Sequence, residues 1–227
     1  MKHLVSRGFA YGFGHVSPDR TKFLVSIPKN ASSFIKNSTG VAGWVGGSAL
    51  DPKLKQSVNE LVVVLRDPLD RWISGFVQYI HTYILYPHGI NTPHLMHETP
   101  TEYDYDMTVE QFAQQYNQLT ERLIFDIINR FDDHVWPQIE LFQELLPNIP
   151  RKYFYINHLF ETEISEYLGI DLNSVSDRNI SDDNVTMKQL KEFFKQRFVI
   201  RPELAQRVKN IYAADYQLIE QIKHDSR

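Results

Sequence analysis

The stretch "VVVLRDPLDRWISGF" (residues 62–76) carries the strongest fold signal in the sequence. It contains most of the run "ELVVVL" (60–65), and a short, continuous β-branched run of this kind predicts a strand buried on both faces. Apolar residues then recur every three or four positions over 68–84, which predicts an amphipathic helix. Asp67 is placed to cap this helix, and Pro68 fits its first turn. We therefore expect a buried strand that runs directly into a helix.

The same order of strand and helix recurs along the chain. Apolar runs and helical periodicity predict strands at "KFLVSI" (22–27) and "KYFYI" (152–156), and helices over 108–116, 137–146 and 201–222. Such alternation favours an α/β fold with a central, mostly parallel sheet flanked by helices. A chain of 227 residues fits a single domain, which we expect to span residues 1–227.

The segment 85–107, "LYPHGINTPHLMHETPTEYDYDM", differs from its surroundings because it has no clean period. It predicts a long ordered loop, and loops of this length inside compact domains often act as lids. We expect it to form a lid or loop beside a binding site; a plain surface excursion is the alternative.

Composition and charge exclude several classes of protein. The net charge of −4 gives no support to binding of a nucleic-acid polymer. The chain has no cysteine, which excludes disulfides, thiolate metal sites and cysteine nucleophiles. The histidines do not fall at metal-ligand spacing, so we expect no metal. No apolar run is long enough for a membrane span or a signal peptide, and we expect a cytoplasmic protein.

A predicted phosphate-binding loop lies at "SIPKNASSFIKN" (26–37), between a strand and a helix. Ser32 and Ser33 lie at the expected helix start, where free N–H groups and the helix dipole favour an anion. Lys29 adds a mobile positive charge at the tip of the loop. The alternative is a serine-capped helix with a solvated lysine.

The second predicted loop follows the strand at 60–65. Arg66 lies at the carboxyl end of this strand, where open α/β sheets bind ligands. Ser74 lies two turns into the following helix, and only a long side chain such as arginine would meet that hydroxyl over a shared anion. The alternative makes Arg66 and Arg71 the ion-pair partners of Asp67 and Asp70.

Together, the two loops resemble the cofactor-binding motifs of the sulfotransferase family. "PKNASS" is similar to the loop that binds the 5′-phosphosulfate of 3′-phosphoadenylyl sulfate (PAPS), and "RDPLDRWISGF" is similar to the 3′-phosphate motif. Three further elements resemble the carbohydrate sulfotransferase branch: "DDHVWPQ" (132–138), "YFYINHLFETEISEYLG" (153–169) and "IYAADYQLIE" (211–220). The absence of cysteine and of an anchor indicates a compact bacterial or viral form.

The resemblance implies a P-loop-kinase-like sulfotransferase fold and a role for each matching residue. Lys29 would contact the bridging oxygen and stabilise charge on the leaving phosphate, and Arg66 and Ser74 would hold the 3′-phosphate. The remaining donor-binding residues would be Pro28, Asn30, Ala31, Ser32 and Ser33 in the first loop, with Arg178 and Ser181 from "DRNISDDN" (177–184). The alternative for 177–184 is a capping loop before a helix at 186–196.

The acceptor hydroxyl needs a general base, and histidine has a suitable pKa. His134 lies in the His-x-x-Pro-Gln element and is the first candidate; a structural histidine hydrogen-bonded beside Asp132 and Asp133 is the alternative. The other candidate bases are His94, His97, Glu98 and Asp104.

The predicted activity is metal-independent transfer of a sulfuryl group from PAPS to a hydroxyl or amine, with adenosine 3′,5′-bisphosphate (PAP) as product. We expect the acceptor to be a carbohydrate or another small molecule; the sequence leaves its identity and the oligomeric state open. One alternative is an ATP-dependent small-molecule kinase, which the missing Gly-x-x-x-x-Gly-Lys-Ser/Thr motif disfavours. Another alternative is a non-catalytic nucleotide-binding module.

Overall fold

A computed structural model describes residues 12–81, 110–111, 114, 134–171 and 184–225. Its five-stranded sheet has the order β3-β1-β2-β4-β5. The strands are β1 (Phe13–Val16), β2 (Lys22–Val25), β3 (Val45–Ser48), β4 (Glu60–Leu65) and β5 (Arg151–Tyr155). β2, β4 and β5 run parallel to one another, whereas β1 pairs antiparallel with both of its neighbours. Only β1 therefore runs against the others, which confirms the predicted mostly parallel sheet.

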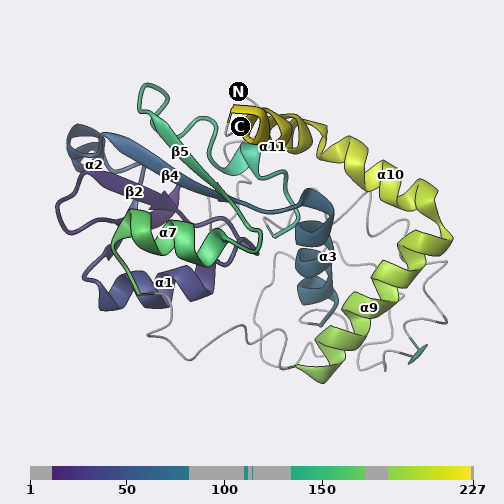
Figure 1. The fold of residues 1–227 in the computed structure, drawn as a ribbon. Coiled ribbons are helices and arrows are strands. Elements are labelled where there is room, and N and C mark those ends of the chain that lie inside the picture. Colours follow the sequence, from purple (N-terminus) through teal and green to yellow (C-terminus); the bar gives the residue numbers. More distant parts are fainter. Residues whose placement is uncertain (1–11, 82–109, 112–113, 115–133, 172–183, 226–227) are drawn as a thin grey trace.

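Helices surround this sheet (Figure 1). They are α1 (Ser32–Val41), α2 (Pro52–Ser57), α3 (Pro68–Tyr79), α7 (Phe160–Leu168), α9 (Val185–Ile200), α10 (Pro202–Ile211) and α11 (Ala213–Asp225), with a 3-10 helix, η3 (Ile139–Leu141). α1 and α7 cover one face of the sheet, and α11 lies on the other, whereas α3, α9 and α10 form a layer beside it. This arrangement confirms the predicted α/β class.

β4 shows why the central strand is apolar throughout. Val62 and Val64 pack with α1 and α7 in one hydrophobic cluster. Leu61, Val63 and Leu65 point to the opposite face and join a cluster formed with α11 and the segment 136–146. Because both faces are covered, every residue of β4 from Leu61 onward is buried, as the continuous apolar run predicts.

The predicted helix over 137–146 is wrong. The structure places only η3 and a series of turns there. The carboxylate of Asp215 accepts hydrogen bonds from the backbone N–H groups of Gln138 and Ile139, so α11 fixes the start of the segment. Leu146, the last residue of the predicted helix, has a left-handed backbone with φ 45°, which would end a right-handed helix there. Tertiary contacts therefore override the helical periodicity.

The predicted single helix over 201–222 is also wrong, because α10 and α11 meet at a break at Tyr212. The backbone of Tyr212 leaves helical geometry, with φ −98° and ψ 21°. Leu204 and Val208 of α10 pack with α3 and α9, whereas Ile219 of α11 packs against the sheet. Because the chain changes direction at Tyr212, α10 can pack in the cluster with α3 and α9 while α11 packs against the sheet.

Several predictions concern residues outside the described part of the chain. These are the lid at 85–107, most of the helix at 108–116, and Arg178 and Ser181. Within the described ranges, no helix combines the length and apolar character needed to cross a membrane.

Candidate functional site

The two predicted loops come together at one edge of the sheet. β2 and β4 are parallel neighbours, so their carboxyl ends lie at the same edge, and each continues into one of the loops. The Arg66 Nη1 atom donates to the carbonyl oxygen of Lys29 at 3.2 Å. Arg71 Nε donates to the carbonyl oxygen of Pro28 at 3.0 Å. The second loop therefore holds two consecutive carbonyls of the first.

The first loop has a tight turn at its tip. The N–H of Asn30 donates to the carbonyl of Ile27 at 3.2 Å, with Pro28 and Lys29 between them. Lys29 has φ 67°, so the turn combines proline at the second position with a positive φ at the third, as in a type II turn. Ala31 is also left-handed, with φ 56°. Alternating left-handed residues of this kind can direct successive N–H groups towards one anion.

The left-handed backbone of Lys29 and Ala31 weakens the argument that the missing glycines disfavour binding of ATP. A glycine would adopt the same backbone without strain, whereas Lys29 and Ala31 adopt it at a cost of about 1 kcal/mol or more each. The loop therefore reaches a wrapped conformation without glycine. The absent Gly-x-x-x-x-Gly motif does not by itself separate this loop from one that binds ATP.

The serine-capped alternative for the first loop is wrong. Ser32 and Ser33 are the first two residues of α1, as predicted. The N-cap position is occupied by Ala31, and no side-chain hydrogen bond caps the helix there. The solvated-lysine alternative is also wrong, because Lys29 is half-buried and its Nζ atom donates to Gln78 Oε1 of α3 at 3.1 Å.

The second loop begins α3 as the sequence predicts. Asp67 is the N-cap, and its Oδ1 accepts from the N–H groups of Leu69 and Asp70 at 3.0 Å each. Arg66 and Arg71 reach across to carbonyls of the first loop, and the buried Arg71 also donates to the carbonyl of Trp136. Pairing with the nearby aspartates, the alternative for these arginines, does not account for these contacts.

Gln138 is a fully buried junction between the two loops. Its Oε1 accepts from Asn30 Nδ2 at 2.6 Å and from the N–H of Arg66 at 3.0 Å. Its Nε2 donates to the carbonyl of Arg66 at 2.9 Å. Asn30, also buried, donates in addition to the carbonyl of Val64 at 2.7 Å. One amide side chain therefore ties the first loop to the end of β4.

Asp215 and Tyr212 hold this junction from α11 and its start. Asp215 Oδ2 accepts from the N–H of Gln138 at 2.7 Å, and Oδ1 accepts from the N–H of Ile139 at 2.8 Å. The Tyr212 hydroxyl donates to the carbonyl of Val135. Burial raises the pKa of Asp215, although the two N–H donors and Arg71 oppose this shift. The closing Tyr-x-x-Asp element therefore fixes the His-x-x-Pro-Gln element.

His134 lies beside α3 through its backbone. A side chain on Gly75 would overlap the His134 carbonyl, so this glycine allows the two segments to touch. Gly75 directly follows Ser74, which is buried in α3. The structure thus brings Lys29, Arg66, Ser74 and His134 into one region.

Other predicted residues lie outside the described ranges. They are the alternative bases His94, His97, Glu98 and Asp104, the aspartates Asp132 and Asp133, and the donor-binding residues Arg178 and Ser181.

Three residues of this region were not predicted as site residues from the sequence: Gln78, Gln138 and Asp215. Arg71 was predicted only as an ion-pair partner of the nearby aspartates, in the alternative for the second loop. Gln138 ends the His-x-x-Pro-Gln element, and Asp215 lies in the closing Tyr-x-x-Asp element. The resemblance of both elements to the family could therefore have indicated these two residues. Gln78 had no such signal, because only the folded chain brings it to Lys29.

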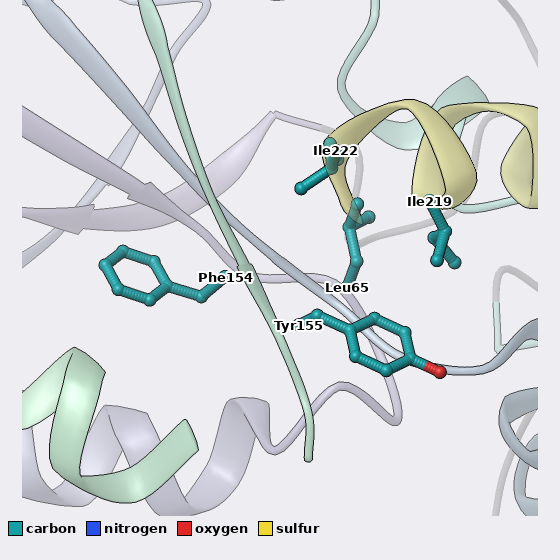
Figure 2. Close-up of a pocket in the computed structure, with 5 residues that line it drawn as sticks. All are labelled: Leu65, Phe154, Tyr155, Ile219 and Ile222. Atoms are coloured by element: carbon teal, nitrogen blue, oxygen red, sulfur yellow. The ribbon is translucent and has the colours of Figure 1, made fainter. Parts of the chain in front are cut away.

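A hollow between the sheet and α11 does not belong to this region. It is lined by Leu65, Phe154, Tyr155, Ile219 and Ile222 (Figure 2). It is too narrow to admit a water molecule, and its lining is almost wholly apolar. The hollow is therefore a packing contact of α11 with β4 and β5.

Comparison with protein families identifies a match for this chain. A family model described as "Sulfotransferase family" matches residues 48–220, which is most of the chain. The match includes Arg66, Ser74, Gln138 and Asp215 but begins after Lys29. No curated protein and no solved structure matches the sequence.

Proposed function

This chain belongs to the sulfotransferase family, and we propose that it transfers a sulfuryl group from PAPS to a hydroxyl or amine of a carbohydrate or other small-molecule acceptor. The observation that carries the proposal is the contact between the two loops, with Arg66 Nη1 3.2 Å from the Lys29 carbonyl oxygen. The family match covers the second loop, and this contact supports the proposal that the first loop belongs to the same site.

The first loop supplies the groups that sulfuryl transfer needs. A bond forms between the acceptor oxygen and sulfur as the bond from sulfur to the 5′-phosphate oxygen breaks, and the phosphate leaves with the electron pair. Lys29 neutralises the charge that develops on this phosphate, and the N–H groups of 29–33, with Ser32 and Ser33, orient the phosphosulfate. A base takes the proton of the acceptor, and His134 beside α3 is our candidate.

The second loop supplies selectivity for the donor. Arg66 and Ser74 hold the 3′-phosphate, which ATP lacks. Arg66 belongs to the second loop, at the carboxyl end of β4, and its guanidinium donates a hydrogen bond to the Lys29 carbonyl of the first loop. We also retain Arg178 and Ser181 as donor-binding residues, and PAP as the product.

Calorimetry tests this proposal. PAP should bind at least about tenfold more tightly than adenosine 5′-monophosphate, because a charge-assisted hydrogen bond contributes about 1.5–3 kcal/mol. Lys29→Ala should reduce transfer to a small residual rate but retain most of the PAP affinity, since the lysine acts mainly on the leaving group. Lys36→Ala, which removes an exposed lysine of α1, is the matched control and should leave transfer unchanged.

Three outcomes would contradict the proposal. Equal affinity for PAP and adenosine 5′-monophosphate would remove the role of the 3′-phosphate. Magnesium-dependent turnover of ATP, in place of PAPS, would favour a small-molecule kinase. A protein that binds PAP but sulfates no member of a broad acceptor panel would be a non-catalytic binding module.

A further inference from the structure

One face of α3 lies along the first loop. Arg71, Ser74 and Gln78 are spaced three and four residues apart, so they share a face of the helix. Arg71 bonds to the carbonyl of Pro28, and Gln78 bonds to the side chain of the next residue, Lys29. Ser74 lies between these two contacts, about 6 Å along the axis from Gln78. The helix therefore runs from the predicted 3′-phosphate residues towards the reacting end of the site.

Lys29 reaches Gln78 from a strained backbone. A lysine with φ 67° costs about 1 kcal/mol or more relative to glycine at the same place, and such strain concentrates at functional sites. The carbonyls of Pro28 and Lys29 are each held by an arginine, so the turn that carries the side chain is fixed. With its base fixed, the ammonium is directed to Gln78 Oε1 at 3.1 Å.

A glutamine is suited to this contact because its side chain is neutral. Its oxygen accepts a hydrogen bond from the ammonium without cancelling the charge. A carboxylate in the same place would bind the ammonium more strongly and would repel an anionic donor. Gln78 is half-buried, so the hydrogen bond is partly shielded from water.

We propose that Gln78 is a positioning residue for Lys29: its Oε1 holds the ammonium where the bridging oxygen of the donor arrives. This inference rests on the proposed function and adds a second residue to its leaving-group side. The lysine exchanges the amide oxygen for the phosphate oxygen as charge develops there. Gln78 therefore acts through Lys29 on the rate of transfer and contributes little to binding of the nucleotide.

The kinetic test uses Gln78→Ala, Gln78→Glu and the double variant Lys29→Ala/Gln78→Ala. Gln78→Ala should lower kcat by about tenfold, because small misplacements of a reacting group are costly, while the Kd for PAP stays within about twofold. Gln78→Glu should lower kcat further and weaken PAPS more than PAP, because the carboxylate neutralises Lys29. The double variant should be no worse than Lys29→Ala. Gln143→Ala, an exposed glutamine, is the control for residue type.

A second measurement does not depend on turnover. The rate at which acetic anhydride labels the Lys29 amine, followed by peptide mass spectrometry, should rise about threefold in Gln78→Ala and fall in Gln78→Glu, since the hydrogen bond to the charged group is lost or strengthened. Lys36 serves as the internal reference.

The outcomes separate the two proposals. If the wild type transfers no sulfuryl group, the proposed function fails and this inference fails with it. If the wild type is active and Gln78→Ala has an unchanged kcat or additive effects with Lys29→Ala, this inference alone is overturned. Unchanged labelling of Lys29 in both variants also overturns it.

Discussion

Gln138 offers the sharpest test of how the two loops are held. We consider Gln138→Leu, which keeps much of the side-chain volume and removes both polar atoms. In the wild type, Gln138 Oε1 accepts from Asn30 and from the N–H of Arg66, and Nε2 donates to the Arg66 carbonyl. The leucine leaves both backbone groups of Arg66 without this partner and removes one hydrogen bond of Asn30.

The magnitude follows from these three bonds. Each of the two half-buried backbone groups loses a partner at a cost of about 1 kcal/mol, the lower end of the usual range, and the bond to Asn30 adds about 1 kcal/mol. We therefore expect the free energy of unfolding to fall by about 3 kcal/mol. This is a large fraction of the roughly 5–15 kcal/mol that stabilises an ordinary domain, although the variant should still fold.

Urea denaturation measures this loss, with Gln143→Leu as the control. Gln143 is exposed on the same segment, so its substitution should change the free energy of unfolding by less than about 0.5 kcal/mol. PAP affinity should fall at least about tenfold in Gln138→Leu, because both loops lose their common anchor. A loss below about 1 kcal/mol, or PAP affinity equal to that of the control, would refute the reasoning.

Three other predictions concern the backbone strain at Lys29, the close packing at Gly75 and the burial of His81. Lys29→Gly should be more stable than Lys29→Ala by about 1 kcal/mol in urea denaturation, because only alanine keeps the left-handed strain; equal stability would argue against that strain. Gly75→Ala should lower the free energy of unfolding by at least about 2 kcal/mol, since the added methyl group overlaps the carbonyl of His134. Gly40→Ala in α1 meets no neighbouring atom and should raise the free energy of unfolding by about 0.5–1 kcal/mol. Thermal unfolding that ranks the two variants equally would contradict the close packing at Gly75. Burial lowers the pKa of His81 below its ordinary 6.5, and its Nε2 contacts Asn184 Nδ2 at 3.1 Å, so the unfolded chain binds the extra proton first. Stability should therefore be lost as pH falls below about 6.5, and His81→Gln should reduce that loss in denaturation curves from pH 8 to 5.

Local sequence predicted the elements whose conformation depends mainly on their own residues. The β-branched run at 60–65 gives β4 with the predicted bounds, and Asp67 caps the following helix. The predicted strands at 22–27 and 152–156 correspond to β2 and β5 within two residues. The resemblance of both loops to sulfotransferase motifs also predicted that they belong to one site.

Other elements depend on partners distant in the chain. β1 and β3 have four residues each, and β3 is Val-Gly-Gly-Ser, so neither carries a strand signal of its own. They form because β1 pairs with β2 and β3 pairs with β1. In the same way, residues 137–146 do not form the helix that their periodicity predicts. Asp215 of α11 instead accepts hydrogen bonds from the N–H groups of Gln138 and Ile139.

Local sequence patterns were sufficient to predict the α/β class, the two loops and the residue types proposed to bind an anion there. How the loops are joined depends on the folded chain. Gln138 and Asp215 lie 77 positions apart, and Lys29 and Gln78 lie 49 apart. Hydrogen bonds over such separations leave no period in the sequence, because their geometry exists only once the sheet and helices have packed.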